Sequence, residues 1–228
     1  MGGIYVISIV FTVIGFILSS RLRSKFNRYS QVPLNNGMNG AEIARTMLRS
    51  YGLHDVEIIQ VDGQLTDHYN PQNKTVNLSY DVYHGRNVAA AAVAAHECGH
   101  AVQHATAYSM LQMRSSLVPL VSFASSIQQY LFMAAMVGMF SVGNNLFMLI
   151  ALGVFGVMAL FSLVTLPVEF DASRRALAWL DKSGVAYGEQ YTGAKDALFW
   201  AAMTYVSAAL AALIQFLYLL LQFLGRDE

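Results

Sequence analysis

The feature that most constrains the fold of this sequence is an uncharged stretch of 54 residues. Residues 115 to 168 contain no Asp, Glu, Lys or Arg. A helix that crosses the hydrocarbon core of a bilayer needs about 20 apolar residues, so the stretch is long enough for two crossings and a turn. Its only clustered turn-forming residues are Gly143, Asn144 and Asn145. We therefore predict a transmembrane hairpin with helices at roughly 118 to 141 and 146 to 166.

Two further uncharged runs lie at the ends of the chain. Residues 1 to 20 and residues 197 to 225 carry no charged side chain, and each run is long enough to cross a bilayer. Basic residues follow the first run from Arg21 onward, whereas a cleaved signal peptide would begin with them, so this run is predicted to stay as an anchor. With 55% hydrophobic and only 12% charged residues, the chain is predicted to be a mainly α membrane protein with about four transmembrane helices.

The basic residues predict the orientation of these helices. Of the 14 Lys and Arg residues, only Arg226 lies outside residues 21 to 114 and 169 to 196. Because basic loops stay in the cytoplasm, both regions are predicted to be cytoplasmic, with the termini and the turn on the other side. The predicted organisation is transmembrane helix 1 (1–20), a cytoplasmic α+β part (21–114), a transmembrane hairpin (115–168), a second cytoplasmic segment (169–196) and transmembrane helix 4 (197–225).

Within the first cytoplasmic part, the sequence predicts a short helix and a small hairpin or sheet. Asn39 and Glu42 form a pattern typical of a capping box, ahead of an amphipathic helix that ends near Gly52. Residues 56 to 61 and 75 to 78 are predicted strands, separated by a polar stretch. If the edge strand of this sheet faces the functional site, an extended peptide can add to it by backbone hydrogen bonds.

The motif that indicates chemistry is His96-Glu97-Cys98-Gly99-His100, an H-E-x-x-H pattern. It lies in an alanine-rich run that Asn87 is predicted to cap as a helix. At i and i+4 the two imidazoles lie one turn apart on one helix face, as two ligands of a single Zn²⁺ require. Glu97 can then take a proton from a water at the open zinc position. We predict one zinc ion per chain and a zinc hydrolase.

The residues alone leave the third zinc ligand open. Glu169 is favoured because it is expected to open a helix at the membrane boundary, which would hold it rigidly. Its alternative role is to complement the dipole of that helix. The other candidates are carboxylates downstream and histidines upstream: Asp171, Asp181, Glu189 and Asp196, and His54, His68 and His84.

Three segments carry a resemblance to a known family. Residues 96 to 103, 65 to 71 and 168 to 173 together resemble the bacterial YugP-type membrane zinc metallopeptidases, and the match covers nearly the whole chain. The arrangement is more distantly similar to the heat-shock membrane protease HtpX. This resemblance implies a zincin-like, gluzincin-like domain in the bacterial cytoplasmic membrane, with its active site facing the cytoplasm. It also implies ligands and a general base, namely His96, His100 and Glu169 for the metal and Glu97 as the base.

The resemblance also raises the question of which residues support the ligands. HtpX-like enzymes often have an aspartate four positions after the ligand glutamate, and here that position is Ser173. Asp171 or Ser173 is therefore expected to orient a zinc histidine. His104, two turns beyond His96, is expected to pack or to support a ligand and not to bind the metal. The sequence does not choose a residue to stabilise the oxyanion among His68, Tyr69, Tyr80, Tyr83, His84 and Arg174.

Three functions fit these features. The first is a membrane-anchored zinc endopeptidase that acts on membrane or membrane-near proteins in the lipid bilayer. The second is a non-enzymatic zinc-stabilised scaffold, whose site would be closed by a fourth ligand such as His104. The third, an intramembrane protease, is disfavoured because the motif helix is too polar to face lipid. A nucleic-acid partner is excluded by the zero net charge and the lack of basic runs, and the single Cys98 excludes an intrachain disulfide framework.

Overall fold

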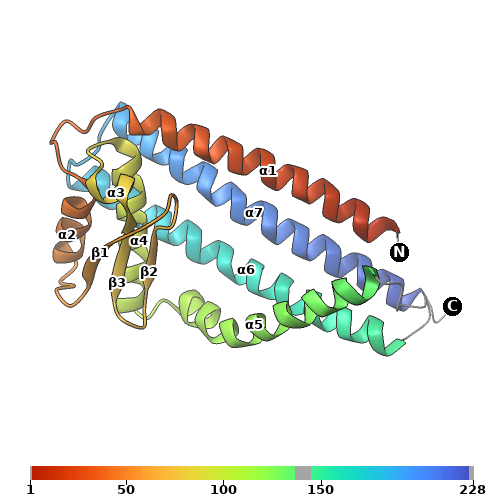
Figure 1. Cartoon of the computed structure of the whole chain (residues 1–228). Helices are drawn as coiled ribbons and strands as arrows, with labels where there is room; N and C mark the ends of the chain where they lie inside the picture. The colour runs from red at the N-terminus through yellow and green to blue at the C-terminus, as the bar shows by residue number, and fades with distance from the viewer. Residues whose placement is uncertain (1, 137–144, 226–228) are drawn as a thin grey trace. The chain divides into compact units, whose positions relative to one another are not determined.

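A computed structural model of the chain describes residues 2 to 136 and 145 to 225 (Figure 1). It is mostly helical and contains one small sheet. The chain forms two compact units, which are taken in turn below. Its elements are α1 (Gly2–Ser30), α2 (Gly40–Ser50), β1 (Glu57–Val61), β2 (His68–Asn70), β3 (Thr75–Ser79), α3 (Tyr80–His84), α4 (Val88–Ala105), α5 (Ser109–Met136), α6 (Asn145–Lys182) and α7 (Glu189–Leu224).

The first unit consists of apolar helix segments. It contains α1 up to Ile17, α5 from Met113, α6 up to Leu166 and α7 from Thr204. Polar side chains join neighbouring helices within it. Gln215 Nε2 donates to Ser8 Oγ at 3.2 Å between α7 and α1, and Ser125 Oγ donates to Met158 Sδ at 3.7 Å between α5 and α6. Such isolated polar contacts are common between helices in a bilayer.

Three helices in the described part of the chain have the length and composition of a membrane span. They cover Gly3–Ser30, Leu146–Lys182 and Glu189–Leu224. The remaining predicted span, 118 to 141, overlaps α5, which is not among them. Gln128, Gln129 and several serines lower the hydropathy of α5. Residues 137 to 141 of that prediction, and Gly143 and Asn144 of the predicted turn, lie outside the described residues.

The second unit, Leu18–Gln112 with Pro167–Met203, contains the sheet. Its strand order is β1-β3-β2, with β1 parallel to β3 and β2 antiparallel to β3. The predicted small sheet is confirmed, but the hairpin alternative is wrong for the two predicted strands because they run parallel. The antiparallel partner is β2, which lies in the polar stretch between them and was not predicted. The short helix α3 was not predicted either.

The core of this unit lies between α2, α4 and the sheet. The alanines of α4 from Ala89 to Ala92 are fully buried, and their small side chains allow α2 to pack closely with Ile43 and Met47. Both predicted helix starts are confirmed. Asn39 and Glu42 form a reciprocal capping box on α2, and Asn87 accepts from the Ala90 N–H at 2.9 Å to cap α4.

The helices near the membrane boundary differ from the sequence prediction. The prediction that Glu169 opens a helix is wrong, because α6 continues without a break through Pro167 to Lys182. A proline usually ends or kinks a helix in water, but spanning helices tolerate it, and the helix-dipole alternative for Glu169 falls with this correction. Likewise α7 begins at Glu189, so Thr192 lies in its first turn and its hydroxyl donates to the Gly188 carbonyl at 3.0 Å.

Candidate metal centre

Three side chains that can bind a metal converge in the second unit. His96 and His100 come from α4 and Glu169 from α6, and their ligand atoms lie within 4.8 Å of one another. Glu169 Oε2 is 3.3 Å from His96 Nε2 and 3.6 Å from His100 Nε2. Two donors that bind one tetrahedral Zn²⁺ at about 2.0–2.1 Å lie about 3.3 Å apart. The three residues therefore fit a zinc ion.

Gly99 allows the two helices to bring these ligands together. A Cβ atom built at this position would lie 2.6 Å from the backbone carbonyl oxygen of Ala172. Ala172 is three residues, or about one turn, after Glu169 on α6. The contact between the backbones of α4 and α6 thus occurs beside the ligands, and any larger residue at Gly99 would separate the helices.

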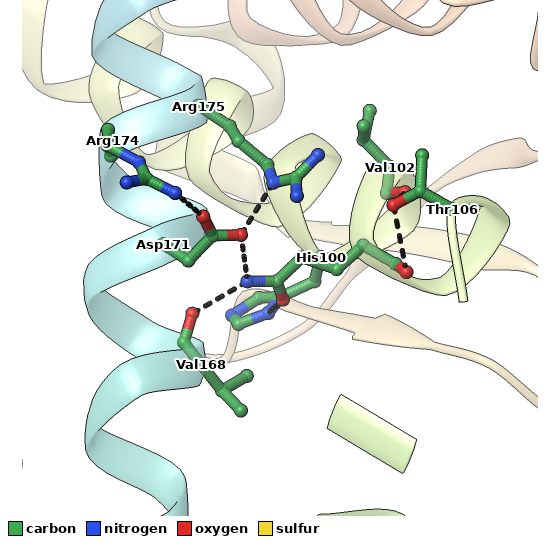
Figure 2. A network of polar contacts seen from close by, with 8 residues as sticks. His100, Val102, Thr106, Val168, Asp171, Arg174 and Arg175 are labelled. Carbon is green, nitrogen blue, oxygen red and sulfur yellow. Dashed lines mark hydrogen bonds and ion pairs between the residues drawn. The ribbon is translucent and has the colours of Figure 1, made fainter. Parts of the chain in front are cut away.

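Each histidine uses its second ring nitrogen for a hydrogen bond. His96 Nδ1 lies 3.1 Å from Ser173 Oγ, and His100 Nδ1 lies 3.0 Å from Gln103 Oε1. Such bonds usually orient metal-binding histidines. Of the two candidates from the sequence, Ser173 contacts His96 directly. Asp171 instead accepts from Gln103 Nε2 at 3.0 Å and from the guanidinium groups of Arg174 and Arg175 (Figure 2).

The expected general base is held by the edge strand. Glu97 is buried, and its Oε2 accepts from the backbone N–H of Tyr69 in β2 at 3.0 Å. The phenol of Tyr69 lies 2.8 Å from His104 Nδ1, with the two ring centroids 5.8 Å apart. Strand β2 is therefore bonded to α4 at two points, one at the motif and one two turns further along.

Comparison with known proteins agrees with this chemistry. The profile of the family described as "Putative neutral zinc metallopeptidase" matches residues 4–224. The chain belongs to this family. A protein of Bacillus subtilis (strain 168) named "Putative membrane protease YugP" is 42% identical over 218 residues, which is 94% of each chain. No solved structure gives a significant match. The resemblance seen in the sequence is thus confirmed.

Burial and charge affect the titratable groups around the motif of this metallopeptidase family member. Burial alone would lower the pKa of His100, but hydrogen bonding to Glu169 and the charges of Glu97 and Glu169 raise it above its ordinary value. A proton therefore competes with a metal ion for His100. Burial also raises the pKa of the Cys98 thiol well above its usual value, so Cys98 is a packed thiol and not a nucleophile.

The other candidates from the sequence lie away from this cluster. His68 Nδ1 is 2.8 Å from the Thr66 carbonyl, and His84 Nε2 is 2.8 Å from Gln60 Oε1. Among the described residues, none of the alternative third ligands joins the metal group. Those alternatives are Asp171, which bonds to Gln103 and two arginines, Asp196, which bonds to Lys25 and Tyr29, and Asp181, Glu189, His54, His68 and His84. Of the oxyanion candidates, Tyr80 and Tyr83 contact the His84 ring, Arg174 pairs with Asp171, and Tyr69 alone touches the catalytic motif.

Two residues near the site were not predicted from the sequence. Gln103 is fully buried between His100 and α6. Asp67, just before β2, accepts from the Ser79 N–H at 2.7 Å and from its hydroxyl. Burial raises the pKa of Asp67, the bonds from Ser79 oppose this shift, and the charge of Glu97 adds to it. The available signal for Gln103 was its position three residues after His100, which places both on one helix face.

Proposed function

We propose that this protein is a membrane-anchored zinc endopeptidase that cleaves membrane or membrane-near proteins. The observation that carries the proposal is the group of His96, His100 and Glu169 donor atoms, in a chain of a zinc metallopeptidase family. Within the described residues, no fourth His, Cys, Asp or Glu completes the group, and His104 is engaged by Tyr69. Three protein ligands with one open position are typical of a catalytic zinc site, which supports an enzyme over a closed scaffold.

The proposed reaction is the hydrolysis of a peptide bond by water. A bound zinc ion supplies a Lewis acid that lowers the pKa of a water molecule and polarises the scissile carbonyl. Glu97 takes a proton from the attacking water and delivers it to the leaving amine as the C–N bond breaks. Because Tyr69 N–H occupies Glu97 Oε2, the second oxygen, Oε1, is the one left to carry this proton. The water thus adds hydroxyl to the carbonyl carbon and hydrogen to the nitrogen.

Strand β2 is the proposed substrate-binding edge. It lies at one end of the strand order β1-β3-β2, and the backbone of Tyr69 bonds toward Glu97 on α4. In an antiparallel ladder, the residues of an edge strand direct their backbone groups alternately toward the partner strand and away from it. An extended substrate segment can therefore pair with β2 beside the general base, with the backbone supplying affinity and side chains supplying specificity.

We place the site at the membrane boundary on the cytoplasmic side. Helix α6 has 38 residues and is about 57 Å long, whereas the hydrocarbon core is about 30 Å thick. Its uncharged part ends at Val168, immediately before Glu169. Since residues 18 to 112 and 167 to 203 belong to one compact unit, the chain between them must cross the bilayer an even number of times. Helix α5 is therefore the proposed fourth span, and the basic residues favour the bacterial cytoplasm for the site.

Metal content and activity test this proposal together. The protein purified in detergent is expected to carry one zinc ion per chain, coordinated by three side chains and solvent in X-ray absorption. It should cleave an unfolded or membrane-derived protein substrate, lose this activity in chelator and recover it with zinc. A protein that retains no zinc, or a zinc ion held by four side chains without turnover, would contradict the proposal and favour a scaffold.

A further inference from the structure

We infer that Gln103 fixes which nitrogen of His100 faces the metal and joins this ligand to α6, which makes Gln103 a positioning residue. The zinc ion in this inference rests on the proposed function. The hydrogen bonds that carry the inference belong to the chain itself. They lie within the second unit, between α4 and the part of α6 that begins at Pro167.

The side chain of Gln103 is fully buried and makes three hydrogen bonds. Its Oε1 lies 3.0 Å from His100 Nδ1. Its Nε2 donates to the Val168 carbonyl at 2.8 Å and to Asp171 Oδ2 at 3.0 Å. Figure 2 shows His100, Val168 and Asp171 around this amide. Both amide protons and the amide oxygen are thus used, so the side chain has one orientation that satisfies all of its groups.

The chemistry of the two acceptors decides that orientation. A backbone carbonyl accepts hydrogen bonds only, and so does an ionised carboxylate. Asp171 is ionised because Arg174 pairs with it and Arg175 Nε donates to it at 2.6 Å. The amide nitrogen of Gln103 must therefore face Val168 and Asp171, and the amide oxygen must face His100.

It follows that His100 Nδ1 carries a hydrogen. An amide oxygen only accepts, so a bond at 3.0 Å requires the imidazole nitrogen to donate. The lone pair of the neutral ring is then on Nε2, which is the nitrogen beside Glu169. His96 differs in this respect, because its Nδ1 partner is the hydroxyl of Ser173, which can donate or accept. Only His100 has its tautomer dictated by its neighbour.

The same amide connects the two ligand-bearing helices. Gln103 and His100 lie on α4, while the Val168 carbonyl belongs to the residue directly before Glu169 on α6. Arg175 orients Asp171, Asp171 orients Gln103, and Gln103 orients His100. Asp171 thus acts on the metal site through Gln103 and not by touching a ligand.

Replacing this amide while keeping its bulk tests the inference. Gln103→Met removes all three bonds at similar volume. Gln190→Met is the matched control, because Gln190 is also buried and its Nε2 donates to the Pro33 carbonyl at 2.8 Å, yet it is not part of the metal group. Loss of an outer-shell partner typically lowers metal affinity ten- to hundred-fold. We expect that loss for Co²⁺ and Zn²⁺ in a chelator competition with Gln103→Met, and parent-like retention with Gln190→Met.

A second readout separates orientation from general destabilisation. In ¹⁵N-histidine NMR of the zinc-loaded protein in detergent, the parent should show His100 with a protonated Nδ1 that exchanges slowly. Gln103→Met should lose that signal, and Gln103→Glu should keep it because a carboxylate oxygen still accepts from Nδ1. Equal metal retention in parent and Gln103→Met, or equal losses in Gln103→Met and Gln190→Met, would overturn the inference. A parent protein that binds no metal would instead overturn the proposed function.

Discussion

At the scale of single residues, Glu97 is expected to act on the reaction and not on the metal. Glu97→Gln keeps the shape of the side chain and an oxygen that accepts from the Tyr69 N–H. It removes the group that takes the water proton, so kcat/KM should fall by about a hundred- to ten-thousand-fold. Zinc content measured on the same sample should stay at the parent level. Turnover close to that of the parent would show that Glu97 is not the base.

Asp67 gives the unit a pH dependence of stability whose sign follows from burial. The folded state raises the pKa of this carboxyl, so its contribution is fully present below the ordinary Asp pKa of about 4 and is lost as pH rises through the raised value. Asp67→Asn keeps an oxygen for Ser79 but does not titrate. In chelator, thermal melting of the parent should fall relative to Asp67→Asn as pH rises from about 4 to neutrality.

Asp55 serves as the control of opposite sign. Its carboxylate pairs with Lys74 at 2.6 Å on the surface, and this hydrogen bond lowers the pKa of Asp55. Its stabilisation is present above the ordinary Asp pKa and is lost as pH falls through the lowered value. The parent should therefore lose stability relative to Asp55→Asn on acidification. A shift of the same sign for both variants would show that burial does not control Asp67.

The residues of the site differ in how far the sequence reveals them. The motif spacing alone pointed to His96, Glu97 and His100, because i and i+4 on a helix dictate one face. The choice between Asp171 and Ser173 depended on which helix turn faces α4, which a sequence does not state. Gln103 was overlooked because a buried amide has no spacing rule of its own, and its role appears only once the acceptors on α6 are known.

At the scale of elements, the approach of α4 to α6 depends on Gly99. Gly99→Ala would place a methyl group against the Ala172 carbonyl oxygen, and this atom belongs to the backbone, so the helices must separate. Overpacking of this kind typically costs about 1–3 kcal/mol, and here the shift also moves Glu169 from the histidines. We expect a lower melting temperature and weaker zinc retention. Gly153→Ala on α6 is the control, because nothing lies within 4 Å of its added Cβ.

Two elements could not be predicted from local sequence. Strand β2 has only three residues in a polar stretch, too few for an alternating pattern, and it is stabilised by pairing with β3 and by the bond from Tyr69 to Glu97. The continuity of α6 was missed because Pro167 and the change to charged residues both suggest a helix boundary. In contrast, α2 and α4 were predicted correctly from their caps, since Asn39 and Asn87 bond within their own first turns.

At the scale of the whole molecule, Glu169 links two segments that are far apart in the chain. Glu169→Ala should weaken zinc retention in chelator by at least ten- to hundred-fold, since it removes a proposed ligand and not only its support. Loss of the metal should also make residues 169 to 196 easier to cleave with an added protease. Asp171→Ala should act in the same direction but more weakly, and Glu189→Ala should do neither. Parent-like retention in Glu169→Ala, with release of zinc in His68→Ala or His84→Ala, would place the third ligand upstream.

The arrangement of the chain in the bilayer can be read with reporter fusions. Fusions at residues 60 and 185 are expected on the cytoplasmic side, because both regions carry the basic residues and both belong to the second unit. A fusion at residue 144, which lies outside the described residues, and one after residue 224 should report the opposite side. If residues 60 and 185 lie on opposite sides, α5 does not span and Glu169 cannot meet the histidines.

The division of the proposed ligands between α4 and α6 has a consequence for how the protein is made. His96 and His100 are synthesised 69 residues before Glu169, and the chain between them includes α5 and the apolar part of α6. A ribosome-bound chain that has not yet delivered Glu169, with Asp171 to hold Gln103 in place, has only two of its three ligands. Proteolytic activity would then begin only after membrane insertion of the hairpin, which protects the translocation machinery and the nascent chain itself from premature cleavage.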